Sequence, residues 1–167
     1  EDGLESSAGL EAVSRCIVEM GTASYYTAIR DLSPDPVLSQ LADLIRQDEV
    51  RHYKYFFRSF NEYREREALG RLPILRAILR RLRMLDEGDS SIALKHSYAL
   101  LHPLDIFDPP RYRQVLKHMR RTVGTRLPVR MSAKMTLKPL RLNYWVNDLL
   151  VRLTAFAAEK SAGLADR

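Results

Sequence analysis

The sequence predicts an all-α fold, and three observations lead to that prediction. Apolar side chains recur at spacings of three and four along much of the 167 residues, the period of an α-helix. Glycine and proline are few, at 7 and 8 residues. No segment shows the strict alternation of apolar and polar residues that is typical of strands. A chain of this length can form one domain with a core, or a core with an appendage.

The first helix is predicted to begin within residues 7–11 and to end near Arg30. One side of it is made of small and apolar residues, yet this side also carries the acid Glu19. Gly21 lies in mid-helix, where glycine costs about 1 kcal/mol relative to alanine. A closely packed helix or a bound group beside Gly21 would explain why it is tolerated.

The second helix is predicted to run from about Asp35 to Leu69, with Gly70 as its C-terminal cap. Ser33 or Asp35 can cap its first turn, and a proline stands at or near its first position. Since the connection at residues 31–36 is short, the two helices should be antiparallel neighbours. Residues at helical spacing then define one face that we expect to be buried: Leu38, Leu41, Ala42, Ile45, Glu49, His52, Phe56, Phe60 and Tyr63.

A carboxylate and an imidazole therefore lie in the middle of an apolar face. Burying such groups is costly unless they are paired or bound to a metal. Glu19 and Glu49 each lie 15 residues from the turn centre near position 34, so antiparallel packing brings them to one level. We expect Glu19, Glu49 and His52 to form a metal site. The alternative is an ion pair of Glu49 with His52, or with an arginine, on a partly exposed face.

These residues resemble a known family. Glu19, followed thirty positions later by the run Asp48-Glu-Val-Arg-His52, is similar to the second half of the ferritin-like di-iron carboxylate superfamily, with the closest likeness to acyl-carrier-protein desaturases and related oxidoreductases. The resemblance covers about residues 8–60. It implies an antiparallel helix bundle in which Glu19, Glu49 and His52 ligate iron, or manganese, for oxygen-dependent desaturase or oxygenase chemistry. It also implies that Asp48 hydrogen-bonds a ligand histidine.

The sequence contains no second Glu-x-x-His. The other half of a two-metal site would have to lie upstream of Glu1 or come from another subunit, as in a homodimer. If it is absent, a mononuclear or vestigial site is the expectation. The chain begins with Glu1 rather than Met, which favours a fragment or a processed chain. Tyr26 is predicted to lie beside the site, where packing is the default role for a tyrosine.

The chain divides by charge into two predicted parts. Residues 1–69, the ferritin-like helix pair, carry a net charge of −5, and residues 70–167, a basic helical extension, carry +11. Helices are expected at residues 72–85, 91–102, 111–123 and 142–160, while residues 124–139 are expected to be irregular. The last helix should present one apolar side, which consists of Trp145, Leu149, Leu153 and Phe156.

The basic extension offers a second, non-enzymatic function: a helical interaction module that binds an acidic partner or an anionic surface. Four cations are the candidates for that contact: Arg113, Lys117, Arg120 and Arg121. An acidic carrier, an electron-donor protein or a membrane surface would suit them, whereas the scarcity of aromatic residues argues against nucleic acid. Iron storage is disfavoured because the extension does not resemble a cage subunit.

Other motifs add little chemistry. His102 lies near Asp105 and Asp108, but turn formation and helix capping explain these residues better than a metal does. His96 and His118 have no ligand partner in the sequence pattern. The single cysteine, Cys16, is predicted to be a small buried residue, and its isolation permits a reducing compartment such as the cytoplasm. No transmembrane span and no phosphate-binding loop are predicted.

Overall fold

The computed structural model describes residues 5–87, 95–100 and 109–164, without the side chains of 85–87 and 158–164. Within these ranges the chain is helical and has no strand, so the predicted all-α class is confirmed. The helices are α1 (Ala8–Leu32), α2 (Pro36–Arg66), α3 (Arg71–Glu87), α5 (Pro109–Gly124), α6 (Val129–Leu137) with the 3-10 turn η1 (Lys138–Leu140), and α7 (Tyr144–Leu164). Residues 95–100 are helical as well, and the rest of the helix predicted at 91–102 lies outside the described residues.

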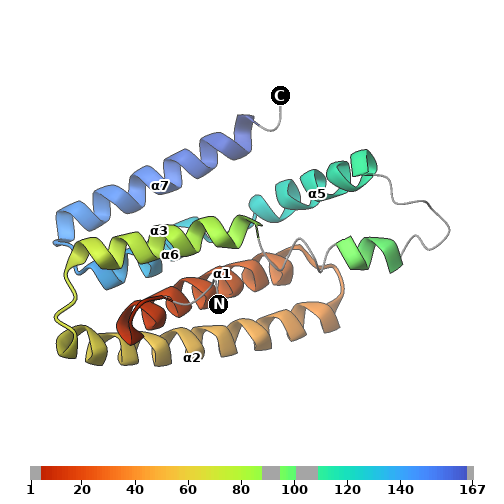
Figure 1. Cartoon of the computed structure of the whole chain (residues 1–167). Helices are drawn as coiled ribbons and strands as arrows, with labels where there is room; N and C mark the ends of the chain where they lie inside the picture. The colour runs from red at the N-terminus through yellow and green to blue at the C-terminus, as the bar shows by residue number, and fades with distance from the viewer. Residues whose placement is uncertain (1–4, 88–94, 101–108, 165–167) are drawn as a thin grey trace.

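The two longest helices, α1 and α2, form an antiparallel hairpin (Figure 1). The Ser7 side chain accepts a hydrogen bond from Leu10 N at the start of α1, and Asp35 accepts hydrogen bonds from the first-turn amides of α2. The sequence predicts both of these starts. Each cap satisfies amides that have no partner within the helix, so the two helices begin at defined residues.

At the turn, the hairpin is closed by contacts that cross from α1 to α2. The Arg30 guanidinium forms an ion pair with Asp43 at 3.0 Å, and Ser39 Oγ donates a hydrogen bond to Arg30 O at 3.1 Å. Arg46 holds the same Asp43 carboxylate at 2.9 Å. These contacts fix the register of α2 against α1 next to the turn.

At the open end of the hairpin, Glu67 caps the neighbouring helix. Its carboxylate accepts a hydrogen bond from Ser7 Oγ at 2.7 Å and from Gly9 N at 3.2 Å. A Cβ atom added at Gly9 would lie 2.6 Å from Leu69 Cδ1 and 2.9 Å from Glu67 Oε2, so a larger residue here would require these side chains to move. The register of the hairpin is therefore fixed at both ends.

The hydrophobic core lies on the side of α1 that faces α3, α6 and η1. It joins α1 residues to side chains of α2, α3 and η1: Ala12, Val13, Cys16, Ile17, Met20, Tyr53, Phe60, Ile74, Ala77, Ile78 and Leu140. The Tyr53 hydroxyl also donates a hydrogen bond to Met135 O at 2.8 Å, which ties α2 to α6. The core thus crosses residue 70, the boundary that the charge pattern suggested.

Two local predictions were wrong. Glu67, not Gly70, caps α2, and Ala68 takes the left-handed conformation with φ of 50°, where glycine was expected. Residues 124–139 contain the regular helix α6 rather than an irregular segment. The two prolines at 128 and 139 stand at its N-cap and beyond its end, so they delimit the helix instead of breaking it.

The expectation that the Glu49–His52 face of α2 is buried was right only in part. Ala42 and Phe60 are buried, but Leu38, Leu41 and Tyr63 are exposed. The reason is the placement of α3 and α6, which pack mainly on the far side of α1 and leave this face of the hairpin open.

The predicted apolar side of the last helix also faces outward. Trp145, Leu149, Leu153 and Phe156 are exposed on α7, while Val151 and Ala155 on its opposite side are buried. In the described part of the chain, no helix combines the length and the apolar character that crossing a bilayer requires.

Candidate metal centre

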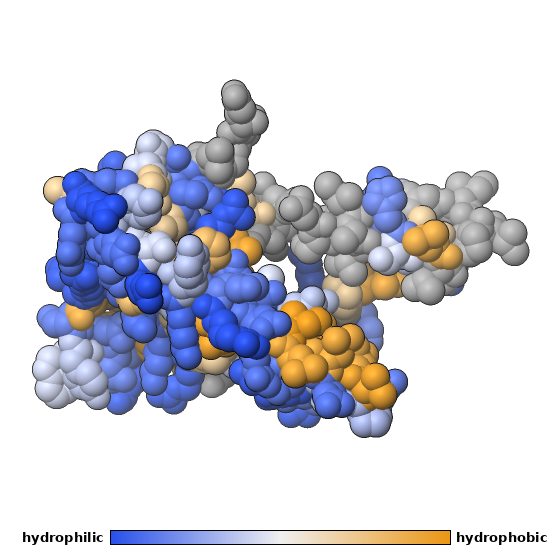
Figure 2. Space-filling model, turned by 90° about the horizontal axis from the view of Figure 1, so that it is seen from below, coloured by the Kyte–Doolittle hydropathy of each residue, from blue (hydrophilic) through white to orange (hydrophobic). Residues whose placement is uncertain are grey.

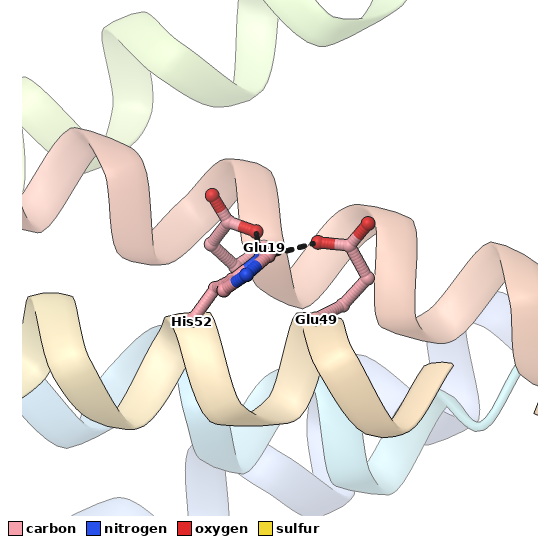
Figure 3. A group of neighbouring side chains, drawn as sticks. All are labelled: Glu19, Glu49 and His52. Atoms are coloured by element: carbon pink, nitrogen blue, oxygen red, sulfur yellow. Dashed lines mark ion pairs between the residues drawn. The ribbon is translucent and has the colours of Figure 1, made fainter. Parts of the chain in front are cut away.

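Glu19, Glu49 and His52 come together on the open face of the hairpin (Figure 3). His52 Nδ1 lies 3.5 Å from Glu19 Oε2 and 3.5 Å from Glu49 Oε2. Each residue offers one ligand atom, and these atoms all lie within 4.8 Å of one another. In the described part of the chain this is the one cluster of three or more acidic, histidine or cysteine side chains with ligand spacing.

The hairpin brings these residues together because its register is fixed at both ends. Glu49 and His52 are one turn apart on α2, so their side chains lie on one face. Glu19 comes from α1 at the same level, as the equal distances from the turn predicted. The helix caps and the Arg30–Asp43 contact at the turn therefore help to position the three side chains, although none of those groups touches them.

Burial and neighbouring charges shift the titration of Glu19. The Glu19 side chain is only 14% exposed, and burial is the main reason that its pKa rises from 4.5 to about 7. The hydrogen bond to Glu49 and the charge of Glu49 raise the pKa of Glu19 further, and His52 opposes the shift. Two carboxylates are thus held against each other with one imidazole as their compensating partner.

The donor set and spacing fit a divalent metal ion. Two ligands that bind one ion at about 2.1 Å, at angles of about 90–110°, lie about 3.0–3.4 Å from each other. The two nitrogen–oxygen distances of 3.5 Å are within a small side-chain movement of this range. Carboxylate oxygens and a neutral imidazole suit iron or manganese. The side chain of His52 is 58% exposed, so an ion can reach the cluster from solvent.

Two further residues, Asp48 and Tyr26, were predicted to support the cluster. Asp48 forms an ion pair with Arg51, three positions along α2, and both side chains are exposed. Tyr26 is half-buried and its ring lies 6.0 Å from that of Tyr25. The outer-sphere role of Asp48, implied by the family resemblance, stays a prediction.

The other candidate residues lie away from the cluster. All four cations predicted for anion or partner binding, Arg113, Lys117, Arg120 and Arg121, are exposed on α5. His96 and His118 are exposed as well, and neither joins a metal-binding group among the residues that the structure describes. The suggested cluster of His102, Asp105 and Asp108 lies outside the described residues.

Gly21 faces a cleft, and the closely packed helix suggested for this position is not seen there among the described residues. Gly21 lines this apolar cleft of about 530 Å³ together with residues of α1, α3, α6 and α7, among them Met20, Leu79 and Ala133. None of the three metal-ligand candidates lines this cleft. The cleft and the cluster therefore use different sides of α1.

Sequence reasoning missed two residues that position the site. Tyr53 is buried on the core side of α2, where its ring stacks on that of Phe57. Its spacing of four and seven from Phe57 and Phe60 was the available signal. Asp43, which joins the two helices at the turn, gave no signal in the sequence because acidic residues on an exposed helix face are common.

Comparison of the sequence with models of protein families and with curated proteins, and comparison with solved structures, found no match. The resemblance to ferritin-like proteins at Glu19, Glu49 and His52 consequently remains a prediction. Any function of the chain has to be inferred from the geometry and chemistry of the cluster itself.

Proposed function

We propose that this chain is the metal-binding part of an oxygen-dependent di-iron oxidoreductase of the desaturase or oxygenase type. The observation that supports the proposal is the cluster of Glu19, Glu49 and His52, three hard or borderline ligands held within 4.8 Å by two antiparallel helices. In di-iron and di-manganese carboxylate bundles, one glutamate comes from each of two helices and a Glu-x-x-His from each of the other two. The hairpin supplies half of that set.

Each ligand has a separate task in the proposed site. Glu49 and His52 share one turn of α2 and define the direction from which a metal is bound. Glu19 adds the ligand from α1, and its carboxyl group must release a proton when it binds, since its pKa is raised to about 7. Iron bound there would supply oxygen activation, while the protein holds the ligands and limits access of water.

Metal content of the purified chain tests this proposal. We expect the wild-type protein to retain about one iron per chain after loading with Fe(II) without oxygen and removal of excess metal. Glu49→Ala and His52→Ala should lose that iron because each removes one of three ligands. Glu62→Ala and His118→Ala are matched controls, since both residues are exposed and lie outside the cluster.

If the Glu49→Ala and His52→Ala variants both retain full iron, the metal site is not the one described. If the wild-type chain binds iron but does not consume oxygen when a reductant is added, the site binds metal without the proposed redox function. A folded wild-type chain with no iron would remove the support for both.

A second function is favoured by a different observation. The C-terminal half of the chain is strongly basic, and its helix α7 turns an apolar side outward. Trp145 is 80% exposed, and the described residues 109–157 contain a single acid, Asp148. An interaction module that docks on an acidic partner or an anionic surface would use this half of the chain. Unlike the oxidoreductase, such a module needs no bound metal, and its binding to the partner should weaken steeply with added salt.

A further inference from the structure

The open face of the hairpin is also the place where the proposed metal site is incomplete. We propose that a second copy of this chain covers this face, so that two hairpins form a four-helix bundle around two sets of Glu19, Glu49 and His52. This inference depends on the metal site proposed above and names the partner that completes it. The ligand count, the symmetry of the apolar side chains and the size of the face support it.

The ligand count points to a second copy. A two-metal carboxylate site needs two single glutamates and two Glu-x-x-His pairs. One chain provides one of each. The three side chains lie together between α1 and α2 (Figure 3), and His52 is 58% exposed while Glu19 and Glu49 are 14% and 18% exposed. An identical hairpin supplies the missing half without any other chain, because a twofold axis through the site duplicates all three ligands.

Two exposed apolar side chains at the ends of this α2 face lie symmetrically about the cluster. Leu38 and Tyr63 lie equally far along α2 from the midpoint between Glu49 and His52, and they are 47% and 37% exposed. Ile45 and Phe56, both half-buried, are again equidistant from that midpoint. A twofold axis that crosses α2 at the level of the site therefore places Leu38 opposite Tyr63 of the second copy, and Ile45 opposite Phe56.

The face is large enough for a stable dimer. The 25 residues of α1 are about 37 Å long, and two adjacent helices are about 20 Å wide. Such a face buries about 1,400 Å² in total when two copies meet, within the range of specific interfaces. Figure 2 shows an apolar patch toward the turn end of α2, and the exposed Leu38 and Leu41 in this part of the helix belong to the face that carries the cluster. Burial of this surface favours association.

The mass of the full chain in solution, with and without metal, tests the inference. We expect addition of Fe(II) or Mn(II) to shift the species from the 19.3 kDa monomer toward a dimer of about twice that mass, with about two metals per dimer. Leu38→Glu should prevent the shift, because a charge would be buried opposite Tyr63 of the second copy. Leu72→Glu is the matched control, since Leu72 is also in the first turn of its helix, α3, and is similarly exposed, at 57%.

The Leu38→Glu variant should remain folded. Position 38 is in the first turn of α2, three residues after the Asp35 cap, where glutamate is favourable for a helix. Circular dichroism of the monomer checks this point.

The outcomes separate this inference from the metal site itself. A chain that binds about one metal and remains monomeric retains the metal site and refutes the second copy. A dimer that Leu38→Glu leaves intact, or that Leu72→Glu disrupts equally, refutes the proposed face. A chain that binds no metal refutes the metal site, on which the dimeric centre depends.

Discussion

Replacement of Glu19 by glutamine should change how the stability of the metal-free protein depends on pH. The pKa of Glu19 is about 7 in the folded chain and ordinarily 4.5. The folded state therefore keeps a proton that the unfolded state loses as pH rises from about 4.5 to about 7. Stability must fall over this range, since the unfolded state binds fewer protons. This loss of stability amounts to at most about 3 kcal/mol, and it is complete above pH 7 and absent below pH 4.

Glutamine cannot ionise, so Glu19→Gln should lack this loss. We expect urea unfolding in the presence of a chelator to show the variant more stable than wild type at pH 8, and nearly equal to it at pH 4. Glu62→Gln serves as the control, because Glu62 is an exposed carboxylate on the same hairpin. With saturating metal at pH 8, the wild type should become more stable than Glu19→Gln, since the metal binds only the wild-type carboxylate set. Parallel pH profiles for wild type and Glu19→Gln would refute the reasoning.

Two further predictions concern the hairpin and its core. Gly9→Ala should destabilise the fold by about 1 kcal/mol in urea unfolding, because its Cβ would lie 2.9 Å from Glu67 Oε2 and displace the carboxylate that caps α1. An unchanged midpoint would contradict this role of Glu67. Cys16 is fully buried and burial raises its pKa to about 12, so a thiol reagent should label it only after unfolding. Rapid labelling of the folded protein would show that the α1 core is more open than described.

The local patterns of the sequence were enough to predict most helices. Apolar spacing and the caps at Ser7 and Asp35 gave the bounds of α1 and α2 to within a few residues. The prediction failed at α6, where prolines suggested an irregular segment but instead delimit a helix. It also failed for Gly70, because the left-handed residue that follows α2 is Ala68, a choice that local sequence does not reveal.

Tertiary packing accounts for the rest of the difference. The helical period identified which α2 residues share a face, and counting from the turn placed Glu19 opposite Glu49. Neither observation says which face of a helix its neighbours will cover. The apolar stripe through Leu38, Leu41 and Tyr63 looked like core, yet α3 and α6 pack elsewhere and leave it open. Periodicity predicts that a face is apolar, not what covers it.

The packing of the fold does not depend on the cluster of Glu19, Glu49 and His52. α1 and α2 are held together by the caps, by the contacts around Asp43 and by a core on the opposite side, none of which involves Glu19, Glu49 or His52. Two carboxylates nevertheless meet there, one of them 14% exposed and with a raised pKa, and Arg51 on the adjoining turn pairs with Asp48 rather than with either of them. A sequence that otherwise satisfies its local preferences commonly departs from them at functional sites. A divalent cation bound by both carboxylates would turn this repulsion into ligation, which is what the proposed metal site predicts.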